Sequence, residues 1–110
     1  MPPRFLTDFE LMIMLAILRL REHAYGVPIA REIEGIAGRA VTLAAVYLAL
    51  DRLQRNRLVT SHLGDPTPAR GGRAKKFFRV TPAGLCAVRQ TQRAFVALWR
   101  NIPELKGALS

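Results

Sequence analysis

The middle of the chain, residues 39–84, constrains the fold more strongly than any other segment. An apolar-periodic stretch, TLAAVYLALDRLQRN, is followed by a short alternating stretch, a loop rich in glycine and proline, and a second alternating stretch, FFRV. A new helical pattern then starts at TPAG. The change in period from 3.6 to 2 and back predicts helix, strand, loop, strand and helix. This order is typical of a DNA-reading helix followed by a β-hairpin wing.

The positive charge is concentrated in the same segment. Eight Arg or Lys residues and one acidic residue, Asp65, lie between Arg52 and Arg79, so this stretch carries +7 of the net charge of +9. A basic loop beside a candidate recognition helix is the electrostatic footprint of a protein that binds duplex nucleic acid. For the charge alone, the alternative is a solvated basic surface without a partner.

Composition limits the other classes of protein. A chain of 110 residues, half of them hydrophobic, is expected to form one small domain with a core. A pI near 11.3 indicates a polyanionic partner, either nucleic acid or an anionic membrane. The single cysteine, Cys86, excludes an internal disulfide, which suits a cytoplasmic location. The apolar run Leu11–Leu18 is too short to span a membrane, and no secretion signal is predicted.

A first helix is predicted from Thr7, which has capping-box spacing to Glu10, to about His23. Its centre is apolar on every side, and a helix of that kind is buried on every side. A small monomer has difficulty burying one helix completely, so we expect Leu11 and Leu15 to meet a second subunit. The alternative is a central helix of a monomeric core.

A short second helix is predicted after Tyr25-Gly26, with Pro28 in its first turn. Its buried face is expected to consist of Ile29, Ile33 and Ile36. Gly35 and Gly38 should end it, and the turn that follows, Arg39–Val41, is a candidate for a brief strand.

The third helix is predicted over about 42–56, with Thr42 as its N-cap. We expect its apolar stripe to be Leu43, Val46, Tyr47, Leu50 and Leu53. The opposite face would then hold Ala44, Ala45, Leu48, Ala49, Arg52 and Arg55. Small residues at the front of that face would let the helix enter the major groove, and Arg52 and Arg55 are candidates for base or phosphate contacts.

The wing is predicted as strands Leu58–His62 and Phe77–Thr81, joined by a tip over Gly64–Lys75. Four cationic residues of the wing are candidates for contacts with phosphates or the minor groove: Arg70, Arg73, Lys75 and Lys76. The alternative for the tip is a solvated, disordered loop.

The last helix is predicted to start at Thr81-Pro82. Its apolar positions follow steps of three and four, which is a heptad seam: Leu85, Val88, Gln92, Phe95, Trp99 and Ile102. The seam predicts a short dimer helix in which Gln92 could set the register. The alternative is that this stripe packs on its own domain.

We find no catalytic constellation in the sequence. His23 and His62 stand alone and lack metal-ligand spacing, and no glycine loop has phosphate-binding spacing. We therefore expect no enzyme activity, no metal and no cofactor.

The chain resembles the PadR family of bacterial transcriptional regulators, and most closely its short members. The resemblance rests on AYGVPIAREIE, TLAAVYLALDRLQRNRLV and LGDPTPARGGRAKKFFRVTPAG, and it extends from about Leu6 to Trp99. It implies a winged helix-turn-helix repressor that dimerises through the last helix, with help from the first, and binds a two-fold operator. It also implies that Tyr47 lies near the DNA backbone and that Tyr25-Gly26 lies near a phosphate.

Two positions depart from the family pattern. Glycine is frequent where Ala44 stands, so the base preference is expected to differ. Glycine is also usual where Arg57 stands, and we expect Asn56 to take the left-handed conformation instead, with Arg57 as a phosphate contact. Some short members bind flat aromatic compounds between subunits, which makes Phe95 and Trp99 candidates for an aromatic effector site. We favour the alternative, in which both fill the dimer core.

The resulting hypothesis is a mainly α protein with a small β-hairpin (α+β). Residues 1–81 would form the DNA-binding winged helix-turn-helix and residues 82–110 a dimerisation helix within the same compact unit. The predicted DNA contacts are Tyr25, Arg39, Thr42, Ala44, Ala45, Tyr47, Arg52, Arg55, Arg70, Arg73, Lys75 and Lys76. The predicted dimer contacts are Leu11, Leu15, Leu85, Val88, Gln92, Phe95, Trp99 and Ile102. A protein–protein adaptor and a non-specific architectural DNA binder are the alternatives, whereas a membrane partner is disfavoured because no basic amphipathic helix is predicted.

Overall fold

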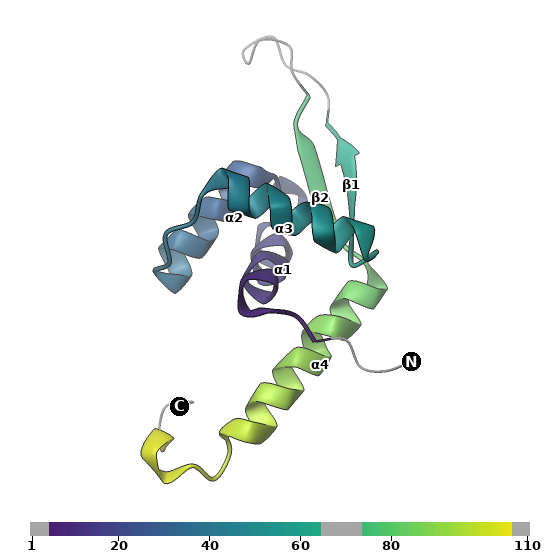
Figure 1. The fold of residues 1–110 in the computed structure, drawn as a ribbon. Coiled ribbons are helices and arrows are strands. Elements are labelled where there is room, and N and C mark those ends of the chain that lie inside the picture. Colours follow the sequence, from purple (N-terminus) through teal and green to yellow (C-terminus); the bar gives the residue numbers. More distant parts are fainter. Residues whose placement is uncertain (1–4, 65–73, 107–110) are drawn as a thin grey trace.

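The computed structural model describes residues 5–64 and 74–106, and it has the α+β fold that the sequence predicts (Figure 1). The elements in chain order are α1 (Asp8–Leu20), η1 (Arg21–His23), α2 (Gly26–Glu32), η2 (Ile33–Ala37), α3 (Leu43–Arg55), β1 (Val59–Leu63), β2 (Lys76–Val80), α4 (Pro82–Trp99) and η4 (Pro103–Leu105). No helix of the described residues is long and apolar enough to cross a membrane.

Three threonines start the three long helices, as predicted. The hydroxyl oxygens of Thr7, Thr42 and Thr81 each accept a hydrogen bond from the backbone N–H three residues on, at 3.2, 3.1 and 3.0 Å. At Thr7 the capping box is complete, because its own N–H donates to the Glu10 carboxylate at 2.9 Å. These bonds satisfy donors that a helix leaves unpaired at its N-terminus.

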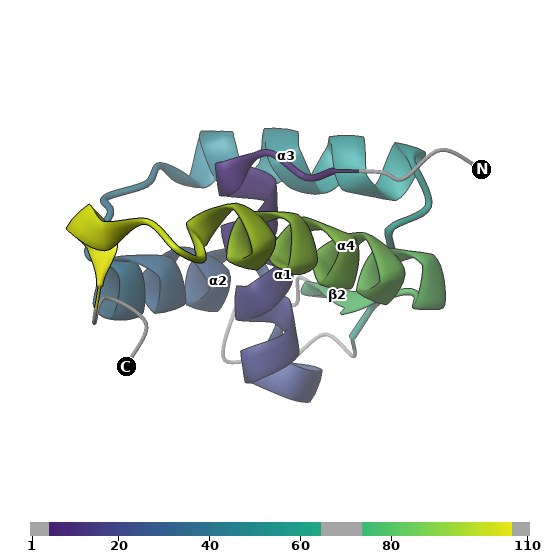
Figure 2. The ribbon, with the colours of Figure 1, turned by 90° about the horizontal axis from the view of Figure 1, so that it is seen from below.

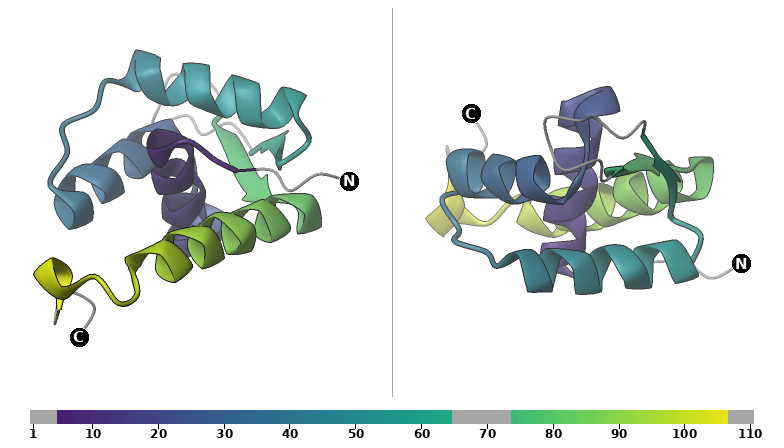
Figure 3. Two further views of the ribbon diagram at one scale, coloured as in Figure 1. Left: turned by 60° about the horizontal axis from the view of Figure 1, so that its bottom comes forward. Right: turned by 90° about the horizontal axis from the view of Figure 1, so that it is seen from above.

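The core forms around α1, which lies between α3 and α4 and crosses both (Figure 3). Seen from below, α1 also passes beside α2 and β2 (Figure 2). The core side chains come from every layer: Ile13, Met14 and Ile17 of α1, Ile29 of α2, Val46, Leu50 and Leu53 of α3, and Val59 and Phe78 of the hairpin. A central helix is therefore buried mainly by its own chain.

The buried face of α3 differs from the predicted stripe. It consists of Val46, Ala49, Leu50 and Leu53. Leu43 and Tyr47 were predicted to be buried but are exposed, and Ala49 was placed on the outer face but has no exposed surface. Apolar and small residues occupy most positions of this helix, so two overlapping stripes satisfy the same period.

The end of the second helix also differs from the prediction. Ile33–Ala37 forms a single π-helical turn, which widens the winding of the helix. Ile36 was predicted to complete the buried face, but the wider turn leaves it 65% exposed. Gly38 then ends the segment with φ 70°, and residues 39–41 form no strand.

Strands β1 and β2 pair antiparallel, from Val59 opposite Val80 to Leu63 opposite Lys76. The first strand starts one residue later than predicted, and the second starts and ends one residue earlier. The hairpin is attached to the helical body through a backbone hydrogen bond from Phe78 N to Ala24 O of 2.8 Å. A two-stranded hairpin is marginal alone, so this attachment and its buried base stabilise it.

The junction between α3, β1 and α4 explains the T-x-x-G pattern. Thr81 donates its hydroxyl to Arg57 O at 2.8 Å, and its N–H donates to Leu58 O at 3.0 Å. A side chain at Gly84 would overlap the carbonyl oxygen of Leu58, so only glycine lets α4 approach this closely. The left-handed residue here is Arg57, with φ 62°, and not Asn56 as predicted.

The first half of α4 packs on its own domain through Gly84, Ala87, Val88 and Thr91. Val88 is only 8% exposed, so it is largely unavailable as the dimer contact that the heptad pattern predicted. Thr91 is buried, and its hydroxyl accepts from Leu6 N at 3.0 Å and donates to Ala87 O at 2.8 Å. The helix ends at Trp99, so Ile102 lies beyond it and the predicted seam is shorter. The second half of α4 extends away from the body (Figure 1).

Candidate nucleic-acid interface

The outer side of α3 and the neighbouring hairpin form one candidate interface, which we call the α3–wing surface. Helix α3 lies at the surface of the molecule, and the hairpin rises beside it (Figure 1). The predicted contact residues Thr42, Ala44, Tyr47, Arg52 and Arg55 are all exposed, and Ala45 is half-buried. Short side chains at the start of the helix allow close approach to a duplex.

The two arginines of α3 differ in their surroundings. Arg55 forms an exposed ion pair with Asp51 one turn earlier, at 3.2 Å between Nη2 and Oδ2. Arg52 is exposed and makes no ion pair with any residue that the structure describes. Arg52 is therefore the cation of this helix that is more available to a polyanion.

Leu48 is a residue of this surface that the predicted contacts omitted. It is 67% exposed and lies one turn after Ala44 and one turn before Arg52. An exposed apolar side chain on a helix in the major groove can contact the methyl group of thymine. Its spacing to Ala44 and Arg52 was the signal in the sequence that could have identified it.

Tyr47 connects the two helices of the helix-turn-helix. A side chain at Gly26 would overlap the Tyr47 hydroxyl, so the ring lies directly against the first residue of α2. Nearly half of Tyr47 is still exposed. The ring thus packs α3 on α2 and leaves part of its surface at the α3–wing surface.

Tyr25 and Lys75, both predicted DNA contacts, contact each other. The ammonium of Lys75 donates to the Tyr25 hydroxyl at 3.0 Å and lies 4.2 Å from the centre of its ring. The Tyr25 ring also meets Phe77 edge-on, with 5.5 Å between ring centres. Both residues are half-buried. The structure therefore brings together two residues that lie 50 positions apart and that were predicted as independent DNA contacts.

Arg39, another predicted DNA contact, is bound to the start of α1. Its guanidinium donates to Asp8 at 2.9 Å and lies 5.3 Å from the centre of the Phe9 ring. The hydrogen bond from Arg39 lowers the pKa of the Asp8 carboxyl below its ordinary value. Arg39 therefore fixes the turn before α3 to α1. The residues next to Arg39 in the sequence did not predict this ion pair.

On the hairpin, Lys76 and Arg79 are exposed on β2, and Thr60 is exposed opposite Arg79 on β1. Arg79 belongs to the basic segment but was not among the predicted contacts. Arg70 and Arg73, predicted at the tip, lie outside the described residues. Lys76 and Arg79 are three positions apart on β2, so their side chains project from opposite faces of the hairpin. The described part of the hairpin thus adds one exposed cation on each of its faces beside Arg52 and Arg55 of α3.

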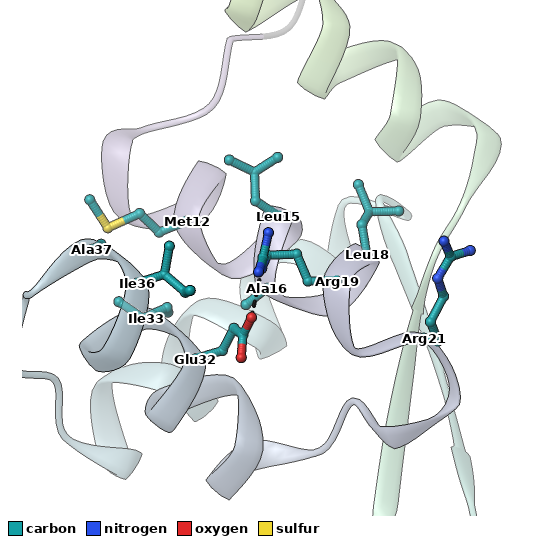
Figure 4. A pocket seen from close by; sticks show the side chains of 10 residues that line it. All are labelled: Met12, Leu15, Ala16, Leu18, Arg19, Arg21, Glu32, Ile33, Ile36 and Ala37. Carbon is teal, nitrogen blue, oxygen red and sulfur yellow. Dashed lines mark hydrogen bonds and ion pairs between the residues drawn. The ribbon is translucent and has the colours of Figure 1, made fainter.

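A second exposed region is apolar (Figure 4). A groove of about 640 Å³ lies between α1 and the α2–η2 segment, and its side chains include Met12, Leu15, Leu18, Ile33 and Ile36. An ion pair between Arg19 and Glu32, 2.6 Å long, closes one part of it. On α4, Phe95, Leu98 and Trp99 are also exposed, and we call these three residues the α4 surface.

Among the described residues, no group of three or more His, Cys, Asp or Glu side chains could hold a metal ion. Cys86 is exposed on α4. His62 stacks on Phe77 with 5.6 Å between ring centres. The described chemistry is that of a surface carrying cations and short side chains.

Comparison with known proteins gives a consistent result. Residues 14–90 match the Transcriptional regulator PadR-like family. A PadR family transcriptional regulator from Eggerthella lenta is 24% identical, with a TM-score of 0.68 over 87% of this chain and 81% of that one. A PadR-like transcriptional regulator from Bacillus cereus is 19% identical, with a TM-score of 0.71 over 90% and 91%. A PadR family transcription regulator from Clostridium difficile is 19% identical, with a TM-score of 0.67 over 91% and 100%. No curated protein sequence matched the chain significantly.

Proposed function

The chain belongs to the PadR-like family of DNA-binding transcriptional regulators, and on this premise we propose that it represses transcription as a homodimer on a two-fold operator. Helix α3 would enter the major groove, and the wing would contact phosphates or the minor groove. The repressor role is inferred from the family resemblance, and no residue of the site determines the sign of regulation.

The observation that carries the proposal is the α3–wing surface. It combines short side chains at the start of α3, an exposed leucine in the middle and arginines near the end. The exposed cations of β2 lie on the neighbouring hairpin. Phosphate contacts from such cations position a protein on DNA, and groove contacts from the helix read the sequence. We propose that Arg52 and Leu48 read bases and that Lys76 and Arg79 contact phosphates.

The homodimer is proposed from the groove and the α4 surface. Large apolar side chains in both regions are exposed in the single chain, among them Leu15, Ile36 and Leu98. Exposed apolar surface of this kind marks an interaction site. We propose that a second copy covers it, with residues 82–110 as the dimerising segment and residues 1–81 as the DNA-binding part of one compact unit. A two-fold dimer would place two copies of α3 about 34 Å apart, one turn of the duplex.

Phe95 and Trp99 have two alternative roles within such a dimer. Both are exposed in the single chain. They would either fill the interface between the subunits or line a site for a flat aromatic effector. We favour the first role, since tryptophan is a common anchor of protein interfaces.

The first experiment is a selection from a random duplex pool at near-physiological salt, with sequencing of the retained DNA. We expect two inverted half-sites about ten base pairs apart. A reporter gene placed behind the recovered site would then fall in expression when the protein is present.

The other outcomes of the selection separate the alternatives. Tight, salt-sensitive retention without enrichment of a sequence would favour an architectural DNA binder. Absence of retention at low salt would contradict the DNA-binding proposal and favour a protein–protein adaptor.

A further inference from the structure

Side chains attach the outer part of the hairpin to the start of α2. Tyr25, the residue before α2, accepts a hydrogen bond from Lys75 and holds its ammonium over the ring. The same ring meets the edge of Phe77, on which His62 stacks from the paired strand. Three aromatic rings and one ammonium thus form a continuous contact from α2 into the wing, which we call the wing strut.

Gly64 makes room for this contact. A side chain at Gly64 would lie 2.6 Å from the Phe77 ring, so the ring occupies the space that any other residue would fill. Directly beside it, Gly64 N donates to Lys75 O at 2.8 Å, and this backbone bond lies one residue beyond both strands. The pairing of the hairpin therefore continues up to the wing strut.

The other anchor of the hairpin lies deeper in the molecule. Phe78 is buried, and its N–H donates to Ala24 O, next to Tyr25 in the chain. At the same level of the hairpin, the side-chain amide of Gln54 on α3 donates to the Ser61 hydroxyl of β1 at 2.9 Å. Tyr25 adds an attachment farther along the hairpin, at Phe77 and Lys75, beyond these anchors of the base.

Tyr25 carries no helix-capping bond from its side chain, although it occupies the N-cap position of α2. Its ring and hydroxyl contact the wing instead. The Lys75 ammonium thus makes two attractive contacts with Tyr25, a hydrogen bond to its hydroxyl and a cation–π contact with its partly buried ring.

We propose that Tyr25 is a positioning residue: through Lys75 and Phe77 it fixes the direction of the wing relative to α3. The wing and α3 can then bind the same duplex without the loss of conformational entropy that ordering the hairpin during binding would cause. This inference deepens the proposed function and depends on it for its effect on DNA. In the free protein it makes a prediction that does not depend on DNA.

The first test is amide hydrogen exchange of the free protein at Gly64, whose N–H reports opening of the outer hairpin. Tyr25→Ala should raise exchange at Gly64 about tenfold, and Tyr25→Phe, which keeps the ring, about threefold. Lys75→Met should also raise it, whereas Lys76→Met, the neighbouring control, should leave it unchanged. Exchange in α1 should not change in any variant, because a merely destabilised protein would open everywhere.

The second test is binding to the duplex that the wild-type protein selects, at full length and after removal of the flanking base pairs that the wing would reach. Tyr25→Ala should bind the full duplex about tenfold more weakly than wild type and the shortened duplex equally well. Tyr25→Phe should lie between the two.

The outcomes distinguish this inference from the function on which it rests. Unchanged exchange at Gly64 in both Tyr25→Ala and Lys75→Met would overturn the positioning role, whatever the DNA result. Failure of wild type to retain any duplex would contradict the proposed function and leave the exchange test valid. If Lys75→Met lowered the salt dependence of binding without affecting Gly64, Lys75 would be a phosphate contact only.

Discussion

The α3–wing surface and the α4 surface are both exposed, but they expose different chemistry. The first intersperses exposed Leu48 and Tyr47 with threonine, alanine and cations, groups that are small or that water solvates well. The second presents Phe95, Leu98 and Trp99, with Leu98 exposed by 74%. A solvated surface can remain open until a partner arrives, whereas large apolar side chains are stabilised only when something covers them. We therefore expect permanent association at one surface and reversible binding at the other.

The largest expected effect comes from breaking the junction that joins the two regions. Gly84→Ala would place a methyl group against Leu58 O and 2.8 Å from Val80 Cγ1. Because a backbone carbonyl cannot move aside as a side-chain tip can, we expect the free energy of unfolding to fall by roughly 3 kcal/mol. Thermal and urea unfolding would measure it.

Gly35→Ala is the matched control for this change. Apart from its chain neighbours and the backbone of its own helix, no atom of the described residues lies within 4 Å of a methyl group added there. Alanine should leave the stability within about 1 kcal/mol of wild type, in the stabilising direction. Equal effects at the two glycines would contradict the role of close approach at Gly84.

The next largest effect is expected on dimerisation through the α4 surface. Trp99→Ala should weaken dimerisation by about 2 kcal/mol, or roughly thirtyfold in the dissociation constant, because a large apolar contact is lost. Sedimentation equilibrium over a concentration series would measure this. Leu63→Ala removes an apolar side chain of the hairpin that is more exposed than Trp99, 70% against 39%, and should leave the dissociation constant unchanged. A wild-type protein that stays monomeric at high concentration would sink the dimer proposal.

A smaller effect is expected at the α3–wing surface. Arg52→Ala should cost about 1.5 kcal/mol of affinity for the selected duplex and should relax the preference at one base position. Competition binding against single-base variants of the duplex would show both. Arg93→Ala removes the same charge from an exposed position on α4 and should alter neither. An identical loss on every duplex would mean that Arg52 contacts phosphate instead of a base.

The smallest effect concerns the ion pair between Asp8 and Arg39. Arg39 lowers the pKa of Asp8 in the folded protein, so the pair stabilises the fold at neutral pH. This contribution is present above the ordinary pKa of 3.8 and is lost as the pH falls through the lowered value. Asp8→Asn should therefore reduce stability slightly at pH 7 and leave it equal to wild type at low pH. Urea midpoints of both proteins, measured across the acid range, would show whether the difference disappears at low pH. A difference in stability that did not change with pH would contradict the ion pair as its cause.

Local chemistry made much of the fold predictable. A threonine at the N-cap position accepts a hydrogen bond from an unpaired N–H of the first helical turn, so it marks where a helix starts. Thr7, Thr42 and Thr81 therefore identified the starts of three helices without any tertiary information. Alternation between polar and apolar residues located the hairpin to within one residue. The basic segment likewise indicated the surface on which its cations gather.

Contacts between distant residues account for what the sequence did not predict. Ala49 is buried, and Tyr47 packs against Gly26 with nearly half of its surface exposed. Periodicity within α3 cannot detect a contact with another helix. Ile36 is exposed in the single π-helical turn, and a search for the ordinary helical period of 3.6 residues does not detect such a turn. Arg39 pairs with Asp8 across 31 positions, and Lys75 with Tyr25 across 50. Residue type identified Arg39, Lys75 and Tyr25 as candidates for DNA contacts, but only the fold shows which partner each one has.

The hydrogen bond from Leu6 to Thr91 has a consequence for synthesis on the ribosome. It joins residues 85 positions apart, and it lies in the layer where Ala87 and Val88 complete the core. The nascent chain therefore cannot finish folding until most of α4 has left the exit tunnel. The α3–wing surface would then be completed only when α4, the helix proposed to bind a second copy, is already present. A translating ribosome would therefore not present a partly folded DNA-binding surface to the chromosome.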